Sequence, residues 1–557
     1  MSKKTVHKKQ KEAPEEVVVM NTESKELSNV MLIVITLALA VIYFVFSTFS
    51  DGFYQHDEVG NFMAAQRIWY DDLLRILGAN TKSGYRLLYA VPALGGFTFL
   101  KFFNSLVAAF TVYFSYKLLA KLGSKNKLLI FFILGLQPLW FMLSFRNYAE
   151  LTVAFLLVMT ALQFYNKNYI LSALIISYVA FTRQEYHMIS GLLFLVLLFK
   201  KEWIAAFLTG TFTVLQNLIG FIITGDILYL PNSVMEYSAK IEGIWPKQGF
   251  DHYFTMSNVI FGSIAITLFV AYIGSVFVKK KKPNLIILIP VILIFLLNCA
   301  FQAQSFKIGP GNGGNLRYLI TISPLLGVLG VMAIDELKGL EKKYLLLIFL
   351  VPLAFVVYAF QSYAHLNYGL HLSDGLNNTE EIENWKPLIF TLITIAILIF
   401  PLKKQHYLIG VAGVSILVAS TSITTRKIQP EEKAVKKAAK WYANHIKLDK
   451  NPQTAQNQLY SDTNRVACGH ALFYYYLGQN KYDFVKPAIM TYLDQETIDT
   501  LQQGDLVVWD SHYGDRKEVA TSQPYQYYES SPNYQKIQYY QSTDNRFTIV
   551  FFKKLFE

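Results

Sequence analysis

The chain alternates between long apolar stretches and short polar loops. The apolar stretches recur from Leu32 to Ile423. Each is about 17–25 residues long, enough for an α-helix to cross a hydrocarbon core of about 30 Å. The pattern predicts an all-α polytopic membrane domain over 29–425, with about thirteen transmembrane helices. The predicted spans are 30–49, 102–120, 128–145, 149–165, 169–182, 187–199, 203–223, 258–278, 284–303, 317–334, 344–361, 387–402 and 407–425.

The charged loops predict the orientation of these spans. Lysine clusters recur at Lys117–Lys127, Lys167, Lys200-Lys201, Lys279–Lys282, Lys338–Lys343 and Lys403-Lys404. If the N-terminal tail 1–28 is cytoplasmic, every cluster falls on the cytoplasmic side, as the positive-inside rule requires. The segment 85–100 would break this alternation as a full span, so it is predicted to be a re-entrant or interfacial helix. Residues 426–557 are then predicted to lie outside.

Composition agrees with this class of protein. The chain has 557 residues, of which 53% are hydrophobic and 16% are charged, and its net charge is +12. A soluble domain carries about a quarter charged residues. The excess lysine lies in the short loops, which explains the net charge without nucleic-acid binding. Cys299 lies in an apolar stretch and Cys468 in the polar C-terminal region, so no disulfide framework is expected, which favours a bacterial inner membrane.

Two segments outside the spans have their own patterns. Residues 58–78 place apolar side chains at helical spacing and predict an amphipathic helix on the outer membrane surface. After about Thr425, the pattern predicts a small extracytoplasmic α/β domain over 426–557. Its expected helices are 430–446, 471–477 and 495–501, and its expected strands are 458–461, 505–509, 536–540 and 547–553.

Polar and charged residues gather at the predicted outer ends of the spans. Gln55-His56-Asp57-Glu58 follows the first span. The other groups are Arg146, Asn147 and Glu150; Arg183, Gln184, Glu185, Tyr186 and His187; Lys307; and Arg317 with Tyr318. An arginine at a span end can be a snorkelling anchor, and Asp57 or Glu58 can simply favour a helix N-terminus. The positive-inside rule, however, disfavours arginine at outer ends. The set as a whole therefore predicts one shared site on the outer face.

The residue types at this site suit a specific chemistry. A carboxylate can act as general base on a sugar hydroxyl. Arginines can clamp a phosphate through bidentate hydrogen bonds. A lipid-linked sugar phosphate requires both groups and arrives in the plane of the membrane. Its phosphate is a good leaving group, so one carboxylate and one or two cations suffice for an inverting transfer.

The order of these motifs resembles the GT-C superfamily of polyprenyl-phosphate-sugar-dependent glycosyltransferases. QHDEVGNFMAAQRIWY is similar to the first-loop Asp-Glu motif of the GPI-anchor and dolichol-pathway mannosyltransferases, and SFRNYAELTVAFLLV to their Arg-Asn-Glu stretch. NLRYLITISPLL resembles their Arg-Tyr stretch, with the proline later than usual and Gly314-Asn315-Leu316 in place of His-Lys-Glu. The protein O-mannosyltransferase and aminoarabinose transferase branches fit as well.

The resemblance implies roles for individual residues. Asp57 is expected to be the catalytic base and Glu58 an orienting carboxylate. Arg317, with Lys307 or Arg183, is expected to bind the donor phosphate. The implied substrate-binding residues are His56, Arg146, Glu150, Glu185 and Tyr318. Some members of the superfamily bind a divalent metal near the first-loop acid, but the sequence defines no metal ligands, because one carboxylate pair without clustered histidines is too little.

Three other classes of protein compete with this interpretation. A flippase or transporter for a lipid-linked glycan usually has ionisable groups near the bilayer midplane, whereas these spans are almost free of charge. A glycan polymerase or ligase would use outer arginines without needing the early Asp-Glu pair. A sensor would leave Asp57 without a role. The expected reaction is therefore the transfer of a sugar, mannose by resemblance, to a lipid, glycan or protein acceptor.

Overall fold

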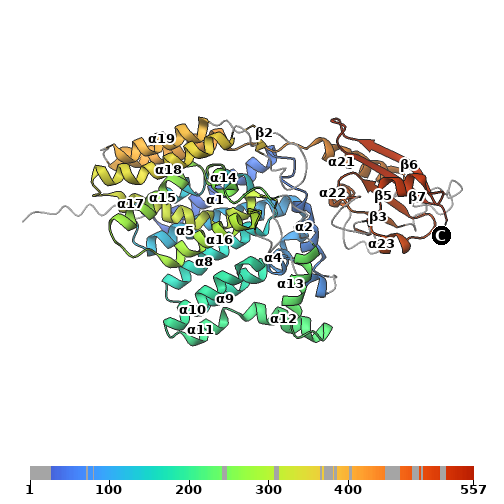
Figure 1. Cartoon of the computed structure of the whole chain (residues 1–557), viewed down its shortest axis with the longest axis horizontal. Coiled ribbons are helices and arrows are strands. Elements are labelled where there is room, and N and C mark those ends of the chain that lie inside the picture. Colours follow the sequence, from blue (N-terminus) through green and yellow to red (C-terminus); the bar gives the residue numbers. More distant parts are fainter. Residues whose placement is uncertain are drawn as a thin grey trace, which may run out of the picture.

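The computed structural model of the protein is a bundle of helices with a small α/β domain at one end (Figure 1). Helices α18 and α19 lie along one edge of the bundle, and α10 and α11 along the opposite edge. The structure describes residues 27–69, 73–78, 81–240, 247–305, 313–363, 367–368, 380–381, 385–400, 404–445, 465–478, 489–490, 493–514 and 522–556.

The first half of the bundle contains two long helices and many shorter ones. The α-helices are α1 (Asn29–Phe49), α2 (Asp57–Arg67), α3 (Leu73–Leu77), α4 (Ser83–Tyr89), α5 (Gly96–Lys121), α6 (Ile130–Ile133), α7 (Pro138–Leu143), α8 (Ala149–Tyr165), α9 (Tyr169–Thr182), α10 (His187–Phe199), α11 (Trp203–Leu208), α12 (Thr211–Thr224) and α13 (Tyr229–Lys240). Three 3₁₀ segments join them: η1 (Pro92–Gly95), η2 (Lys127–Leu129) and η3 (Gln184–Tyr186).

The second half of the bundle contains longer helices. They are α14 (His252–Phe261), α15 (Ser263–Val278), α16 (Leu285–Gln302), the 3₁₀ segment η4 (Leu316–Ile322), α17 (Ser323–Leu337), α18 (Lys342–Tyr363), α19 (Trp385–Ile399) and α20 (Lys404–Ser422). Between α18 and α19, the two short strands β1 (Asn367–Tyr368) and β2 (Glu380–Glu381) pair antiparallel.

Helix length decides how much of the predicted topology the structure supports. Among the described residues, five helices are long and apolar enough to cross a membrane, or up to seven if each of two bent pairs forms one span. Five further apolar helices have 10–17 residues, fewer than the about 20 of a typical span. The polytopic helical architecture is therefore confirmed, and the count of about thirteen spans stays a prediction.

Several predicted spans are interrupted in the structure. The stretch 258–278 bends by 115° between α14 and α15. Gly262 lies at this bend with φ 79°, and a Cβ there would lie 3.1 Å from Pro138 Cδ. Only glycine adopts this conformation without strain. The stretch 128–145 is likewise divided among η2, α6 and α7, the last of which begins at Pro138.

Two boundaries differ from the sequence-based prediction in the first long loop. The predicted helix over 58–78 is divided into α2 and α3. The predicted non-spanning segment 85–100 contains the end of α4 and all of η1, but from Gly96 onward it belongs to α5. The long helix therefore starts before the predicted residue 102. Pro92 opens η1, where its missing N–H costs no hydrogen bond.

The C-terminal domain is built around a five-stranded mixed sheet. Its strand order is β4-β3-β5-β7-β6, with β3 parallel to β4 and β5, and β7 antiparallel to β5 and β6. The strands are β3 (Val466–Cys468), β4 (Ile489–Met490), β5 (Leu506–Asp510), β6 (Tyr534–Gln541) and β7 (Thr548–Lys554). The helices are α21 (Pro430–His445), α22 (Ala471–Tyr476), α23 (Gln495–Asp499) and α24 (Tyr525–Ser530). The predicted strand 458–461 lies outside the described residues.

An apolar core joins this domain to the first long loop. One buried cluster contains Val59 and Phe62 of α2 together with Leu472 and Phe473 of α22. The apolar face of α2, predicted to lie on the membrane surface, is therefore covered by protein. The domain lies beside α2 and α4 in Figure 1, next to the Asp-Glu motif.

Candidate active site

A buried ion pair braces the loop after α1. Glu58 Oε1 accepts hydrogen bonds from the Tyr54 backbone N–H at 2.6 Å and from Arg146 Nη1 at 3.0 Å. Arg146 also donates to the Gly52 carbonyl at 2.7 Å and to the Ser50 hydroxyl at 2.9 Å. The exposed fractions are 0% for Glu58 and 1% for Arg146. Both charged groups are therefore paired with partners inside the protein, and these contacts fix the path of the loop.

A second buried carboxylate brings two distant arginines together. Glu150, in the first turn of α8, is fully buried. Its Oε1 contacts Nη1 of Arg183, and it lies 3.2 Å from Nε of Arg317. Arg183 Nε also contacts Glu185 Oε1 at 2.5 Å. Because Glu150 holds both guanidinium groups, their remaining N–H donors have fixed directions.

Arg317 connects this cluster to the first-loop acid. Its Nη2 lies 2.5 Å from Asp57 Oδ2, and its Nη1 donates to the side-chain oxygen of Gln55. Asp57 and Arg317 are 260 positions apart in the sequence. The structure thus brings together the residues that sequence analysis assigned to proton abstraction and to phosphate binding.

Aromatic rings support the two guanidinium groups from the side. The guanidinium carbon of Arg317 lies 4.6 Å from the ring centre of Tyr148 and 5.4 Å from that of Tyr318. That of Arg183 lies 4.7 Å from the same Tyr318 ring. A cation over the face of an aromatic ring is stabilised electrostatically. Tyr318, predicted as substrate-binding, therefore holds both arginines.

Asp57 is the carboxylate of this cluster that faces outward. Its side chain is 56% exposed, whereas that of Glu150 is 0% exposed. Burial among protein groups raises the pKa of Asp57, but Arg317 and Lys82 oppose it and hold the pKa at about 2. Asp57 is therefore ionised near neutral pH and is accessible from outside the protein.

Lys82 is a member of the site that sequence analysis missed. Its Nζ donates to Asn61 Oδ1 at 3.0 Å. Burial lowers the pKa of Lys82, while nearby Asp57 and Glu150 raise it. The signal that singled out the arginines was present here too, since a lysine in a predicted outer loop goes against the positive-inside rule.

The position of Arg317 depends on an unusual local backbone. Residues Leu316–Ile322 form a 3₁₀ segment of seven residues, longer than most. The Asn315 side chain accepts a hydrogen bond from the Arg317 N–H at 3.2 Å and so starts this segment. Gly314 precedes it with φ 75°, and a Cβ there would lie 2.8 Å from His252 Nε2. Gly314 therefore lets the chain approach α14 closely before it turns into the site.

The other predicted residues have different surroundings. Lys307 lies outside the described residues. His187 contacts the Gln184 carbonyl at 2.6 Å and the Thr213 hydroxyl at 3.0 Å. Glu185 is held by Arg183, as described above. His56 turns away from the arginines and joins a second polar cluster.

That second cluster contains three histidines and one glutamate. His56, Glu431, His470 and His512 each present one nitrogen or oxygen, and these atoms all lie within 4.8 Å of one another. Sequence analysis grouped only His56 with the site, because the other three lie in the C-terminal region. This cluster is the group of His, Cys, Asp and Glu in the described part of the chain that could hold a metal ion.

The same overall fold, a helical bundle with a small α/β domain, is found among solved structures. One of the solved structures that the chain resembles is ArnT from Cupriavidus metallidurans. The chain matches its structure bound to undecaprenyl phosphate with a TM-score of 0.54 and 12% identity, covering 94% of this chain and 98% of that one. The apo structure of the same protein gives a TM-score of 0.52 at 12% identity with the same coverage. No family model matches the sequence, and no curated protein does. The likeness shows an ArnT-like fold, and together with the apolar helices it supports the predicted integral membrane protein.

Proposed function

We propose that the protein is a glycosyltransferase that moves a sugar from a polyprenyl-phosphate donor to an acceptor hydroxyl. The observation that carries this proposal is the contact of 2.5 Å between Asp57 and Arg317. It joins a base open to solvent to a guanidinium held rigidly by Glu150. An inverting displacement needs these two functions on opposite sides of one sugar unit.

The reaction assigns a task to each charged group. The acceptor oxygen forms a bond to the anomeric carbon as the bond from that carbon to the phosphate oxygen breaks. Asp57 accepts the proton of the acceptor hydroxyl. Arg317 and Arg183 stabilise the negative charge on the departing polyprenyl phosphate. Lys82 adds a third cation beside Asp57.

Donor binding is expected to rearrange the contact between Asp57 and Arg317. The phosphate and Asp57 are both anions that compete for the same guanidinium. When the phosphate takes the outward N–H donors of Arg317, Asp57 loses that ion pair and can turn to the acceptor. Glu150 keeps Arg317 in place throughout, because it is buried and also bound by Arg183. The competition thus couples donor arrival to the readiness of the base.

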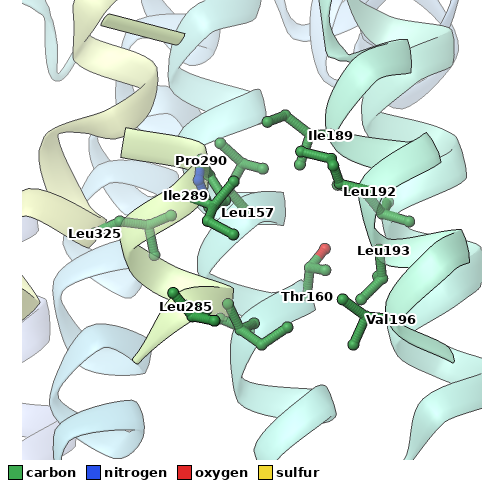
Figure 2. Close-up of a pocket in the computed structure, with 13 residues that line it drawn as sticks. Leu157, Thr160, Ile189, Leu192, Leu193, Val196, Leu285, Ile289, Pro290 and Leu325 are labelled. Carbon is green, nitrogen blue, oxygen red and sulfur yellow. The ribbon is translucent and has the colours of Figure 1, made fainter. Parts of the chain in front are cut away.

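An apolar groove beside the site suits the polyprenyl chain. Figure 2 shows the open space between α16 and α10, with Leu285 and Pro290 on one side and Leu193 and Val196 on the other. The groove has about 590 Å³ of open space. It is lined by Leu157, Thr160, Ala161, Ile176, Ile189, Leu192, Leu193, Val196, Leu285, Ile286, Ile289, Pro290 and Leu325. Thr160 is the one polar residue among them, so the groove favours a hydrocarbon.

The helices that carry the site also line this groove. Leu157 lies seven positions after Glu150 on α8, which is about 10 Å along the helix axis. Ile189 on α10 lies six positions after Arg183, and Leu325 on α17 lies eight positions after Arg317, each on the helix that follows the arginine. A lipid with its phosphate at the arginines would therefore reach the groove with its chain.

Loss of Arg317 is expected to weaken donor binding. Charge-assisted hydrogen bonds contribute about 1.5–3 kcal/mol each, so Arg317→Ala should reduce the affinity for undecaprenyl phosphate about ten- to a hundredfold. The measurement is binding of undecaprenyl phosphate to purified protein in detergent. Lys281→Ala is the control, because it removes a cation from an exposed pair with Glu336 away from the site. Equal affinities for wild type and Arg317→Ala would refute the phosphate assignment.

Filling the groove should affect long donors more than short ones. Val196→Trp places a large ring in the groove, while Leu195→Trp places the same ring on the neighbouring, exposed position of α10. Each buried CH₂ contributes about 0.8 kcal/mol, so Val196→Trp should cut the preference for undecaprenyl over short-chain phosphates by about tenfold or more. The measurement compares the two affinities for each variant. The same preference in both variants would mean that the polyprenyl chain binds outside this groove.

Sidedness and substrate identity complete the proposal. The lysine clusters favour a bacterial inner membrane with the N-terminus in the cytoplasm and residues 426–557 outside. Mannose is proposed as the sugar because of the first-loop motif, and the acceptor is proposed to be a lipid, glycan or protein on the outer face. The structure matched here is that of ArnT bound to undecaprenyl phosphate, which supports a donor built on such a lipid.

A further inference from the structure

We propose that His56, Glu431, His470 and His512 bind one divalent transition-metal ion of the zinc class. The four residues come from separate parts of the chain. His56 precedes α2, and Glu431 lies in the first turn of α21. His470 precedes α22, and His512 follows β5. The site would thus join the first outer loop to the C-terminal domain.

The distances already approach those of a coordination sphere. Glu431 Oε1 lies 2.7 Å from His512 Nδ1, 3.0 Å from His470 Nε2 and 3.8 Å from His56 Nδ1. With zinc bonds of about 2.0–2.1 Å in a tetrahedron, ligand atoms lie about 3.3 Å from one another. The three distances from Glu431 fall on either side of this value. The ligand atoms of the whole group lie within 4.8 Å of one another, so side-chain rotations that move these atoms by about an ångström would admit the ion.

The ligand chemistry favours zinc over harder cations. Three imidazole nitrogens and one carboxylate oxygen suit zinc, copper, iron or nickel, whereas magnesium and calcium prefer oxygen ligands. Four protein ligands complete a tetrahedron and leave no open position, which is typical of structural zinc sites.

The surroundings of the cluster show a built site. The exposed fractions are 0% for His470 and 5% for Glu431. Glu431 Oε2 and His470 Nδ1 are buried and have no hydrogen-bond partner among the residues that the structure describes. A buried carboxylate with one free oxygen is costly unless a cation compensates it. Asp510 accepts hydrogen bonds from the backbone N–H of His512 at 3.0 Å and of Tyr513 at 2.7 Å, which holds the His512 turn.

The position of His56 connects the proposed metal site to the proposed catalytic base. His56 is the residue immediately before Asp57, and its backbone begins α2. A metal bound to His56 and to three ligands of the C-terminal domain would tie that domain to the loop that carries the proposed base. The C-terminal domain thereby acquires a task that the sequence did not reveal.

Metal content of the purified full-length protein tests the site. The protein is prepared with an affinity tag free of histidine, incubated with Zn²⁺ and dialysed, and its metal is measured by mass spectrometry. We expect about one zinc per chain in the wild type and in His445→Ala, because His445 is an exposed histidine on the same helix as Glu431. We expect none in His470→Ala or Glu431→Gln. Metal-free wild type, or variants that keep their zinc, would overturn the proposal.

A second measurement does not depend on the folding of any variant. Chelator-stripped wild type is titrated with Co²⁺, which shows strong visible absorption when it is bound in a tetrahedron. We expect an end point near one equivalent, and we expect Zn²⁺ to abolish the bands and to raise the thermal midpoint by several degrees. Weak octahedral absorption, or no change in midpoint, would mean that the cluster is only a hydrogen-bonded group around Glu431. Neither measurement uses sugar transfer, so its outcome is independent of the proposed reaction.

Discussion

Asp57→Asn should abolish most sugar transfer while leaving donor binding intact or stronger. Asparagine keeps the size of the side chain but cannot take the acceptor proton, and general-base catalysis contributes roughly 10²–10⁴-fold. The same change removes the anion that competes with the donor phosphate for Arg317. Affinity for undecaprenyl phosphate should therefore stay equal or rise several-fold. Transfer rate and binding affinity are measured on the same preparations.

Two substitutions are expected to change donor affinity in opposite directions, which makes this expectation specific. Arg317→Ala lowers donor affinity, whereas Asp57→Asn preserves or raises it. A residue that merely favours the N-terminus of α2 would contribute only about 0.5–2 kcal/mol of stability. In that case, Asp57→Asn would turn over substrate at nearly the wild-type rate at matched folded amounts, and Asp57 would not be the base.

Arg146→Met should cause the largest loss of stability in the membrane domain. Removal of one partner of a buried ion pair leaves the other charge uncompensated, at a cost of about 3–5 kcal/mol. Here the carboxylate of Glu58 would remain at 0% exposure without its guanidinium. The loop at Gly52 and Ser50 would also lose its donors. Thermal unfolding in detergent, followed by size-exclusion chromatography, measures the loss.

A double variant distinguishes a structural role of Arg146 from a role in substrate binding. Arg146→Met with Glu58→Gln removes both charges, so much of the lost stability should return. Lys343→Met is the control, since its pair with Glu341 is 66% exposed on both sides and such pairs contribute about 0–1 kcal/mol. If Arg146→Met unfolded at the wild-type temperature and lost donor affinity, Arg146 would be a substrate contact instead.

The meeting of Asp57 and Arg317 was predictable for a physical reason. A membrane confines the span ends to two planes, so charged residues on the same side are brought into one layer however far apart they are in the sequence. Basic loops define the other plane, and three arginines on the wrong side then stand out. Sidedness thus replaced the contact information that a single sequence lacks. Lys82 carried the same signal.

The breaks within the spans were not predictable from hydropathy. Gly262 lies in an apolar stretch that reads as one continuous helix, and its φ of 79° becomes apparent only in the structure. The bend depends on close packing against Pro138, which is distant in sequence. Apolar periodicity therefore predicted that these segments are helical but not where they bend.

The neighbours of His56 could not be predicted from the sequence, for a different reason. Glu431, His470 and His512 are far from one another along the chain and follow no metal-binding spacing. They meet because α21, α22 and β5 pack into one domain, which in turn docks on α2. The same docking covers the apolar face of α2. That arrangement depends on side-chain packing between domains, which leaves no periodic signal.

Sugar transfer by purified protein tests the central claim most directly. Wild type and Asp57→Asn, in the same detergent and at matched folded amounts, are given polyprenyl-phosphate sugars, with the mannose donor first, and a panel of lipid, glycan and peptide acceptors. The account predicts that wild type releases one polyprenyl phosphate for each sugar transferred, and that Asp57→Asn does so about 10²–10⁴-fold more slowly. Wild type that binds undecaprenyl phosphate but transfers no sugar from any donor would contradict it and would favour a flippase.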